Sequence, residues 1–260
     1  MSLVKTRPQL LEGEVAVARF SGEQDSIGRL VGETTDRLIV RLPSTEGSLP
    51  APGAWCYVAV VGFETDGTAI VSKDSPLVVT RLLEGLVPEL SSGQVRIMRI
   101  AREPGRRTKV AVATSDADLD PVAAVVGRTG WIVNFVAELL GGERIEVIPW
   151  SPRPEVLLAR AFAPAKVESV TIDDDGTATV RVAPHMMAPA VGQDGLNSIL
   201  AARLAGKLKL GGRWRIPKVT VVSTEDLPHP PHGSVATVSL DSKPASGEEE
   251  PAGAAAGEAA

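Results

Sequence analysis

Short apolar runs rich in Val and Ile fill the first part of the chain, residues 13–73. Gly, Pro and Asp-Gly turn signals separate these runs, for example at residues 50–53 and at Asp66-Gly67. Apolar, β-branched runs bounded by turn residues are typical of strands. About five short strands in about sixty residues predict a small barrel, either of OB type or of another small β-sheet module.

From Pro76 the apolar positions recur at helical spacing, and Pro suits the first position of a helix. The composition of residues 103–106, Glu-Pro-Gly-Arg, indicates a turn between two strand-like runs. The predicted elements are a helix from Pro76, strands at 94–102 and 109–114, a short helix from Pro121, a longer helix to Leu140 and a strand at 144–148.

The same order of elements returns directly afterwards. The predicted elements are a helix at 154–162, strands at 167–172 and 177–182, a short helix at 186–191, a longer helix at 196–204 and a strand at 207–210. The run IPKVTVV can add one further strand. Beyond residue 224 the chain is rich in Pro, Gly, Ser, Ala and Glu, which predicts a disordered acidic tail over 224–260.

A Gly-x-x-Gly loop precedes the longer helix in each half. Gly127 and Gly130 correspond to Gly192 and Gly195, sixty-five positions later. A chain with 25 glycines holds about two such spacings by chance, so the matching flanks carry the argument. An apolar residue precedes each loop, an apolar helix follows, and a Gly closes each helix. These features together predict a duplicated unit.

A glycine loop between two helices leaves backbone N–H groups free at a helix start, where a phosphate can bind. Two such loops in tandem indicate a nucleic-acid backbone as the ligand. The candidate site comprises both loops, the residues next to them and a basic run before them. Its members are Gly127, Arg128, Thr129, Gly130, Trp131, Gly192, Gln193, Asp194, Gly195, Asn197, Arg102, Arg106, Arg107 and Lys109.

Charge and composition limit how this site can work. The formal net charge is −5, and residues 76–210 carry 16 basic and 15 acidic side chains. Nucleic-acid binding must therefore rest on local patches and backbone donors. The basic run from Arg96 to Lys109 is either an RNA contact or a solvated strand edge. Trp131 either stacks on a base or packs on its own helix.

Other classes of function find little support. The single cysteine, Cys56, excludes an internal disulfide or a multi-cysteine zinc site, and its apolar surroundings predict a buried thiol. The acidic run from Asp116 to Asp120 lacks the Gly and Glu of a calcium loop. We expect no enzyme activity, no cofactor and no metal. With no secretory signal and no membrane-length apolar stretch, the chain is expected to be cytoplasmic.

The middle of the chain resembles the tandem KH domains of the NusA transcription elongation and termination factors. The resemblance rests on LVPEL–SSGQVRIMRIAREPGRRTKVAV, DLDPVAAVVGRTG, ERIEVIPWS, ARAFAPAKVESV and AVGQDGLNSILAARLAG. GTAIVSKDSP and APGAWCYVAVV are similar to the OB-type barrel of the same family. The resemblance implies an α+β architecture, a small OB-type β-barrel followed by two prokaryotic-type (type II) KH domains. The expected divisions are a lead at 1–12, the barrel at 13–74, and KH domains at 75–150 and 151–215.

The resemblance implies single-stranded RNA binding and a role in pausing, elongation, termination or antitermination, with RNA polymerase or other transcription factors as further partners. This sequence departs from the family pattern at several places. The barrel begins near residue 13, so the helical domain that contacts polymerase is expected to be absent. Thr129 and Gln193 stand where the family usually has Lys, and Trp131 where a small polar residue is usual, whereas Asn197 is kept. The alternative is a KH scaffold that binds a protein partner with little RNA affinity.

Overall fold

The computed structural model describes residues 10–47, 49–206, 216, 218–226 and 235–239, and these divide between Leu82 and Leu83 into two compact units. The predicted lead, except for its last residues, lies outside the described part of the chain. So does the predicted tail, except for residues 224–226 and 235–239. Each unit has its own hydrophobic core.

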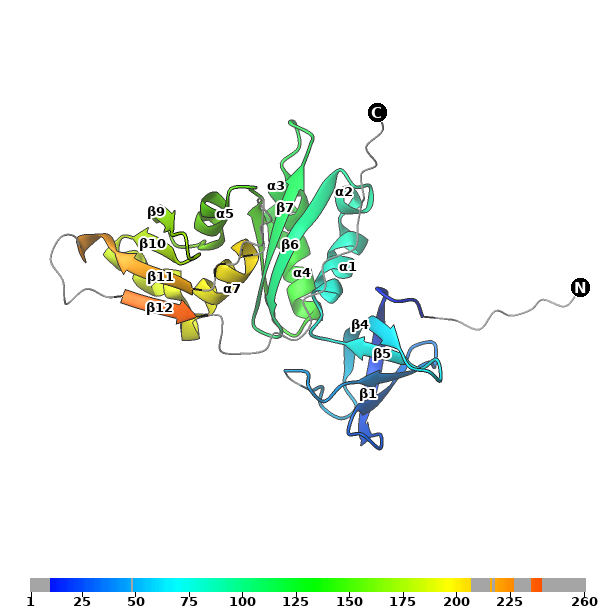
Figure 1. The fold of residues 1–260 in the computed structure, drawn as a ribbon. Coiled ribbons are helices and arrows are strands. Elements are labelled where there is room, and N and C mark those ends of the chain that lie inside the picture. The colour runs from blue at the N-terminus through cyan, green and yellow to red at the C-terminus, as the bar shows by residue number, and fades with distance from the viewer. Residues whose placement is uncertain (1–9, 48, 207–215, 217, 227–234, 240–260) are drawn as a thin grey trace, which may run out of the picture. The chain divides into compact units, whose positions relative to one another are not determined.

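The first unit is a closed β-barrel with strand order β1-β2-β3-β5-β4 (Figure 1). Inward-facing residues such as Phe20, Val40 and Val60 are fully buried. Gly32 lies under the Phe20 ring, where a Cβ atom would approach the ring to 2.6 Å, so a larger residue would displace the main core aromatic. The prediction of an OB-type barrel is confirmed. Its strands are Val15–Gln24, Leu30–Thr34, Ile39–Leu42, Trp55–Phe63 and Ala69–Ser72.

The second unit begins within α1 and contains two repeats of one pattern. The first repeat, from α1 to β8, has the sheet order β6-β7-β8, with β6 antiparallel and β8 parallel to β7. Helices α3 and α4 pack on β8, and α3 also packs on β7. The elements are α1 (Pro76–Leu86), α2 (Pro88–Ser91), β6 (Val95–Glu103), β7 (Arg107–Thr114), α3 (Pro121–Val126), α4 (Trp131–Leu139) and β8 (Arg144–Pro149).

The second repeat, from α5 to β11, has the same order of elements. Strand β11 pairs parallel to β10, as β8 pairs parallel to β7. The elements are α5 (Pro154–Ala161), β9 (Val167–Ile172), β10 (Ala178–Val182), α6 (Met187–Val191), α7 (Leu196–Ala205) and β11 (Lys218–Ser223), and β12 (Val235–Ser239) joins the edge of this sheet.

The end of the second repeat differs from the prediction. Residues 207–210, predicted to be its last strand, lie outside the described residues, and β11 takes that place in the sheet. The second repeat therefore extends beyond residue 215. Within the predicted disordered tail, residues 224–226 form a 3-10 turn and β12 pairs with β11. The reason is local, because three of the five residues in VATVS are β-branched, which favours a strand at the edge of a sheet.

The two repeats share one hydrophobic core. Ala111 and Ile148 on the first sheet belong to the same buried cluster as Leu157, Phe162 and Leu200 of the second repeat. Helix α7 contacts β6 and β7, and Figure 1 shows it beside the first sheet. Residues 108–112 of β7 are all buried, as expected for a strand covered on both faces. The second repeat thus covers the face of the first sheet that α3 and α4 leave open.

Candidate nucleic-acid interface

The first glycine loop turns the chain sharply between α3 and α4. The Asp120 carboxylate caps α3 by accepting hydrogen bonds from the N–H groups of Val122 and Ala123, at 2.9 and 3.1 Å. The helix ends at Gly127, which has φ 75° and ψ 168°. Thr129 and Gly130 then adopt left-handed conformations, with φ of 59° and 80°. Because of these turns, α4 starts in a new direction at Trp131.

The second loop repeats this backbone almost angle for angle. Gly192 has φ 74° and ψ 170°, Asp194 has φ 54° and Gly195 has φ 73°. Each φ lies within about 7° of its counterpart in the first loop. A one-turn 3-10 helix, Arg128–Gly130 or Gln193–Gly195, occupies the centre of each loop. The duplication seen in the sequence is therefore also a duplication of the loop conformation.

The first glycine of each loop is required by both conformation and space. A φ near +75° with ψ near 170° is accessible almost only to Gly. A Cβ atom on Gly127 would lie 2.7 Å from the side chain of Ile132, and one on Gly192 would lie 2.9 Å from the backbone nitrogen of Asn197. Each loop is thus packed directly against the start of the helix that follows it.

Both loops present their central residues to solvent. Arg128, Thr129, Gln193 and Asp194 are exposed. Among the described residues, the backbone N–H groups of these four residues donate no hydrogen bond to a backbone carbonyl group outside regular helices and strands. Exposed N–H groups at the start of a helix are suited to bind a phosphate oxygen.

The apolar segment around the first loop does not form one long helix. Residues Pro121–Leu139 have the length and hydropathy of a membrane-spanning helix. The loop divides them into α3 and α4, because Gly127, Thr129 and Gly130 all have positive φ. The stretch is therefore a helix-loop-helix element and offers no continuous helix to a membrane.

An exposed aromatic strip begins directly after the first loop. Trp131 and Phe135 lie one turn apart on α4 and are 50% and 42% exposed. The indole of Trp131 also lies against the loop, since its Cδ1 atom would be 3.1 Å from a Cβ atom on Gly127. Trp131 thus packs on the loop and still offers an open face. Phe135 was not among the predicted site residues, although its i, i+4 spacing from Trp131 was visible in the sequence.

The second loop is tied to the first repeat by ionic and polar contacts. Arg106 Nη2 lies 2.7 Å from Asp194 Oδ2, and both side chains are largely exposed. Arg107 Nη1 donates to Asn197 Oδ1 at 3.1 Å. The Asn197 amide in turn donates to the carbonyl groups of Phe162, Pro189 and Ala190. Asn197, a predicted site residue, is fully buried, so it orients the loop and Arg107 from inside the fold.

Two members of the predicted basic run are also buried. Arg102 forms a paired, 2.9 Å interaction with both carboxylate oxygens of Glu143, and that carboxylate is fully buried. Lys109 is 0% exposed and lies 2.6 Å from Glu146. Burial lowers the pKa of Lys109, and the charge of Glu146 opposes that change. The structure thus places Arg102 and Lys109, both predicted to contact a ligand, inside the fold, where internal carboxylates hold them.

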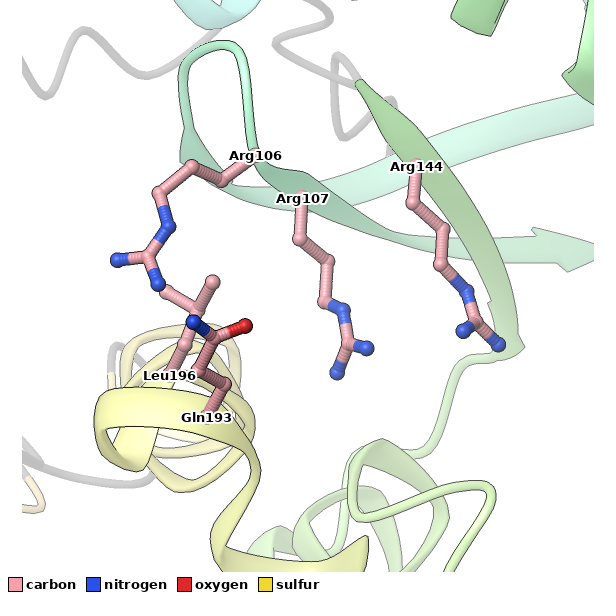
Figure 2. A pocket seen from close by; sticks show the side chains of 5 residues that line it. All are labelled: Arg106, Arg107, Arg144, Gln193 and Leu196. Carbon is pink, nitrogen blue, oxygen red and sulfur yellow. The ribbon is translucent and has the colours of Figure 1, made fainter. Parts of the chain in front are cut away.

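Three arginines instead line a hollow at the junction of the repeats. A cavity of about 250 Å³ is bordered by Arg106 and Arg107 of the first repeat, by Arg144 at the start of β8, and by Gln193 and Leu196 of the second loop and helix (Figure 2). Arg144 and Leu196 were not predicted, because no local pattern places β8 beside residues 193–196. Among the described residues, no group of three or more His, Cys, Asp or Glu is placed to hold a metal ion.

Comparisons with known proteins agree with this architecture. Residues 73–150 match the family model of a NusA-like first KH domain, and residues 154–208 match that of a NusA-like second KH domain. The chain is similar to the transcription termination/antitermination protein NusA of Bacillus subtilis (38% identity over 152 residues, 58% of this chain and 41% of that protein). The chain is also similar to the NusA protein of Thermus thermophilus, with 35% identity over 62% of this chain and 42% of that protein. It is similar to the NusA protein of Mycobacterium bovis as well, with 32% identity over 85% of this chain and 64% of that protein.

The barrel, the repeated helix-loop-helix elements and the paired glycine loops define an α+β protein with an OB-type barrel and tandem prokaryotic-type KH domains. The chain belongs to the NusA-like family. It spans between 41% and 64% of the length of these relatives.

Proposed function

We propose that this chain is a non-enzymatic RNA-binding factor of NusA type that acts in transcription elongation, pausing, termination or antitermination. It binds single-stranded RNA through its two KH repeats. Because the chain spans only part of its relatives, its contact with RNA polymerase or with other transcription factors belongs to the same proposal, as does its action in the cytoplasm.

The observation that carries the proposal is the pair of exposed loops with the same backbone. Each loop exposes its central residues to solvent at the start of a helix, where their N–H groups can bind an anion. The φ angles of corresponding residues in the two loops agree within about 7°. A KH loop of this kind clamps the backbone of about four nucleotides. Two of them on one shared core offer successive grips to one RNA strand.

The aromatic strip supplies a contact for the bases. Trp131 and Phe135 expose large apolar surface directly beside the first loop. Base stacking on an aromatic side chain contributes about 1–3 kcal/mol for each base, whatever the base is. The loop thus holds the backbone and the strip holds a neighbouring base. This contact offsets part of the missing positive charge of the loop.

Fluorescence anisotropy with a labelled single-stranded RNA tests the proposal. Wild-type protein should bind, and the Thr129→Asp variant should bind at least about tenfold more weakly at low salt, because it puts a carboxylate where a phosphate sits. Asp accepts the left-handed conformation at this position, so the fold is retained. The matched control is Thr35→Asp, an exposed position on the barrel with the same charge change.

Wild-type protein that shows no binding near 50 mM salt would contradict the proposal. Equal weakening by Thr129→Asp and Thr35→Asp would show that net charge, and not the loop, decides affinity.

A second candidate function is a KH scaffold for a protein partner. The specific observation in its favour is that the second loop has no cation and that its Asp194 pairs with Arg106. Recovery of RNA polymerase or a termination factor with the tagged chain after nuclease treatment, together with absent RNA binding, would favour this alternative.

A further inference from the structure

The face of the first sheet that packs on the second repeat becomes more charged toward one end. Pairs of residues in register on β7 and β8 mark this change. Ala111 beside Ile148 is apolar and buried, and Lys109 beside Glu146 is an ion pair. The last pair, Arg107 beside Arg144, places two like charges on neighbouring strands. Like charges in such a position are destabilising unless a counter-charge is present.

The protein supplies only part of that counter-charge. Glu146 Oε2 lies 2.6 Å from Lys109, while Oε1 lies 3.0 Å from Arg144 Nε and 3.7 Å from Arg107 Nε. One carboxylate therefore serves a lysine and two arginines. Its buried Oε1 atom has no well-aligned hydrogen-bond donor among the described residues. This end of the sheet thus carries an excess of positive charge.

The hollow at this end has room for an anion. Its volume of about 250 Å³ corresponds to the space of about eight water molecules. Figure 2 shows the Arg106 side chain extending toward Gln193 and Leu196, whereas Arg107 and Arg144 extend from neighbouring strands in roughly the same direction as each other. Arg144 keeps a 60% exposed side chain, so its guanidinium remains accessible. Guanidinium groups bind phosphate oxygens in paired hydrogen bonds.

We propose that this hollow binds one phosphodiester group of the RNA at the second loop, and that the Asp194 carboxylate competes with that phosphate for Arg106. The inference rests on the proposed function and deepens it. The second loop has no cation of its own, and the hollow provides the missing cations from the first repeat. In the absence of RNA, Asp194 forms an ion pair with Arg106, and this ion pair must break when the phosphate binds.

The position of the hollow next to the second loop favours an RNA phosphate over an acidic peptide as its ligand. The hollow borders the loop whose N–H groups form the second grip, and Gln193 belongs to both. A strand held by the loop necessarily carries further phosphates at regular spacing next to it. A carboxylate of a partner protein would need a separate route into the same space.

The first test removes a charge at the hollow. We expect Arg144→Gln to weaken binding of a labelled single-stranded RNA about three- to tenfold near 100 mM salt, and to reduce the salt dependence by about one phosphate contact. The matched control is Arg96→Gln, an exposed residue on the same sheet. Arg96 pairs with Ala113, six residues along β7 from Arg107 and so about 20 Å away. It should leave the affinity unchanged.

The second test removes the competitor. Asp194→Asn should strengthen binding about three- to tenfold, because Arg106 is then free for the phosphate. In an Arg106→Gln background the same change should have a much smaller effect, since the pair is already broken. Asp194 is 66% exposed on its side chain, so its replacement does not threaten the fold. Thermal unfolding of each variant confirms this.

The outcomes separate this inference from the proposed function. One outcome is that Thr129→Asp weakens RNA binding while Arg144→Gln and Asp194→Asn leave the affinity unchanged. That outcome would support the proposed function and would show that the hollow is not a phosphate site. A gain from Asp194→Asn that is equally large without Arg106 would overturn the competition. Stabilisation by inorganic phosphate that depends on Arg144, with unchanged RNA binding, would reassign the hollow to a free anion. Absence of RNA binding by the wild type would overturn both proposals.

Discussion

Glu143 and Glu146 decide which cations of the first repeat face the solvent. The Glu143 carboxylate forms a buried ion pair with Arg102, and the Glu146 carboxylate forms an ion pair with the buried Lys109. Arg106 and Arg144 remain more than 40% exposed on their side chains. A buried charge is stable only beside a partner, so each internal carboxylate removes a cation from the exposed surface.

Cys56 lends itself to a chemical test at the residue scale. Burial raises the pKa of its thiol to about 11. At pH 8 the thiolate fraction is then about a thousandth, against roughly a tenth or more for an unfolded thiol. We expect alkylation by iodoacetamide to be at least about fiftyfold slower in the folded protein than in urea, and to accelerate as the pH rises toward 11. Equal rates in both states would contradict the predicted protection.

The two helix-loop-helix elements have the same backbone and different surroundings. Helix α4 covers one face of its sheet and leaves Trp131 and Phe135 exposed. Helix α7 lies between its own sheet and the first sheet, so residues such as Leu200 and Leu204 are fully buried. The first loop therefore has an aromatic surface beside it, whereas the second has the arginine-lined hollow. Duplicated elements acquire different contacts because only one of them is enclosed.

Glu143 also joins separate elements of the first repeat. It receives hydrogen bonds from Arg102 on β6, from the N–H of Gly105 in the turn and from Thr108 on β7, at 2.6–2.9 Å. We expect Glu143→Gln to lower the free energy of unfolding by about 3 kcal/mol, because the buried network loses the carboxylate charge that lies beside the Arg102 guanidinium. Urea unfolding measures this loss.

The matched control for that change is Glu138→Gln, at an exposed position on α4. It should alter the unfolding free energy by less than about 0.5 kcal/mol. Similar effects of both substitutions would mean that the buried network does not hold the β6–β7 turn in place.

At the scale of the whole second unit, the packing of one repeat on the other creates the surface that we propose to bind RNA. One hydrophobic core runs through both repeats. Arg203 Nη1 lies 3.0 Å from Glu103, and the Arg99 guanidinium lies 5.5 Å from the centre of the Trp150 ring. These contacts keep the second loop beside β7 and β8. The two loops thus belong to one compact unit.

This surface predicts a modest salt dependence of RNA binding. Among the described residues, its accessible cations are Arg128, Arg106, Arg107 and Arg144. With about 0.7 released counter-ions for each phosphate on single-stranded RNA, the slope of log affinity against log salt should be roughly −3. Anisotropy titrations between about 50 and 300 mM salt measure it. A slope near zero, or one steeper than about −6, would show that other groups dominate the contact.

The amino-acid sequence by itself determined the local structure and the family. Hydrophobic periodicity, turn residues and the glycine spacing predicted the barrel, the order of elements in both repeats and both loops, because these features depend on neighbours close in the chain. The shared conformation of the two loops follows from Gly127 and Gly192, whose backbone angles almost no other residue can adopt.

The tertiary structure alone decided which charged residues are accessible. Lys109 and Arg107 lie two positions apart on one face of β7, yet the second repeat buries the first completely and leaves the second beside the hollow. Arg144 and Gln193 are 49 positions apart and meet only because the shared core brings the repeats together. Burial and electrostatic pairing across such distances depend on packing between elements, which local sequence patterns do not encode.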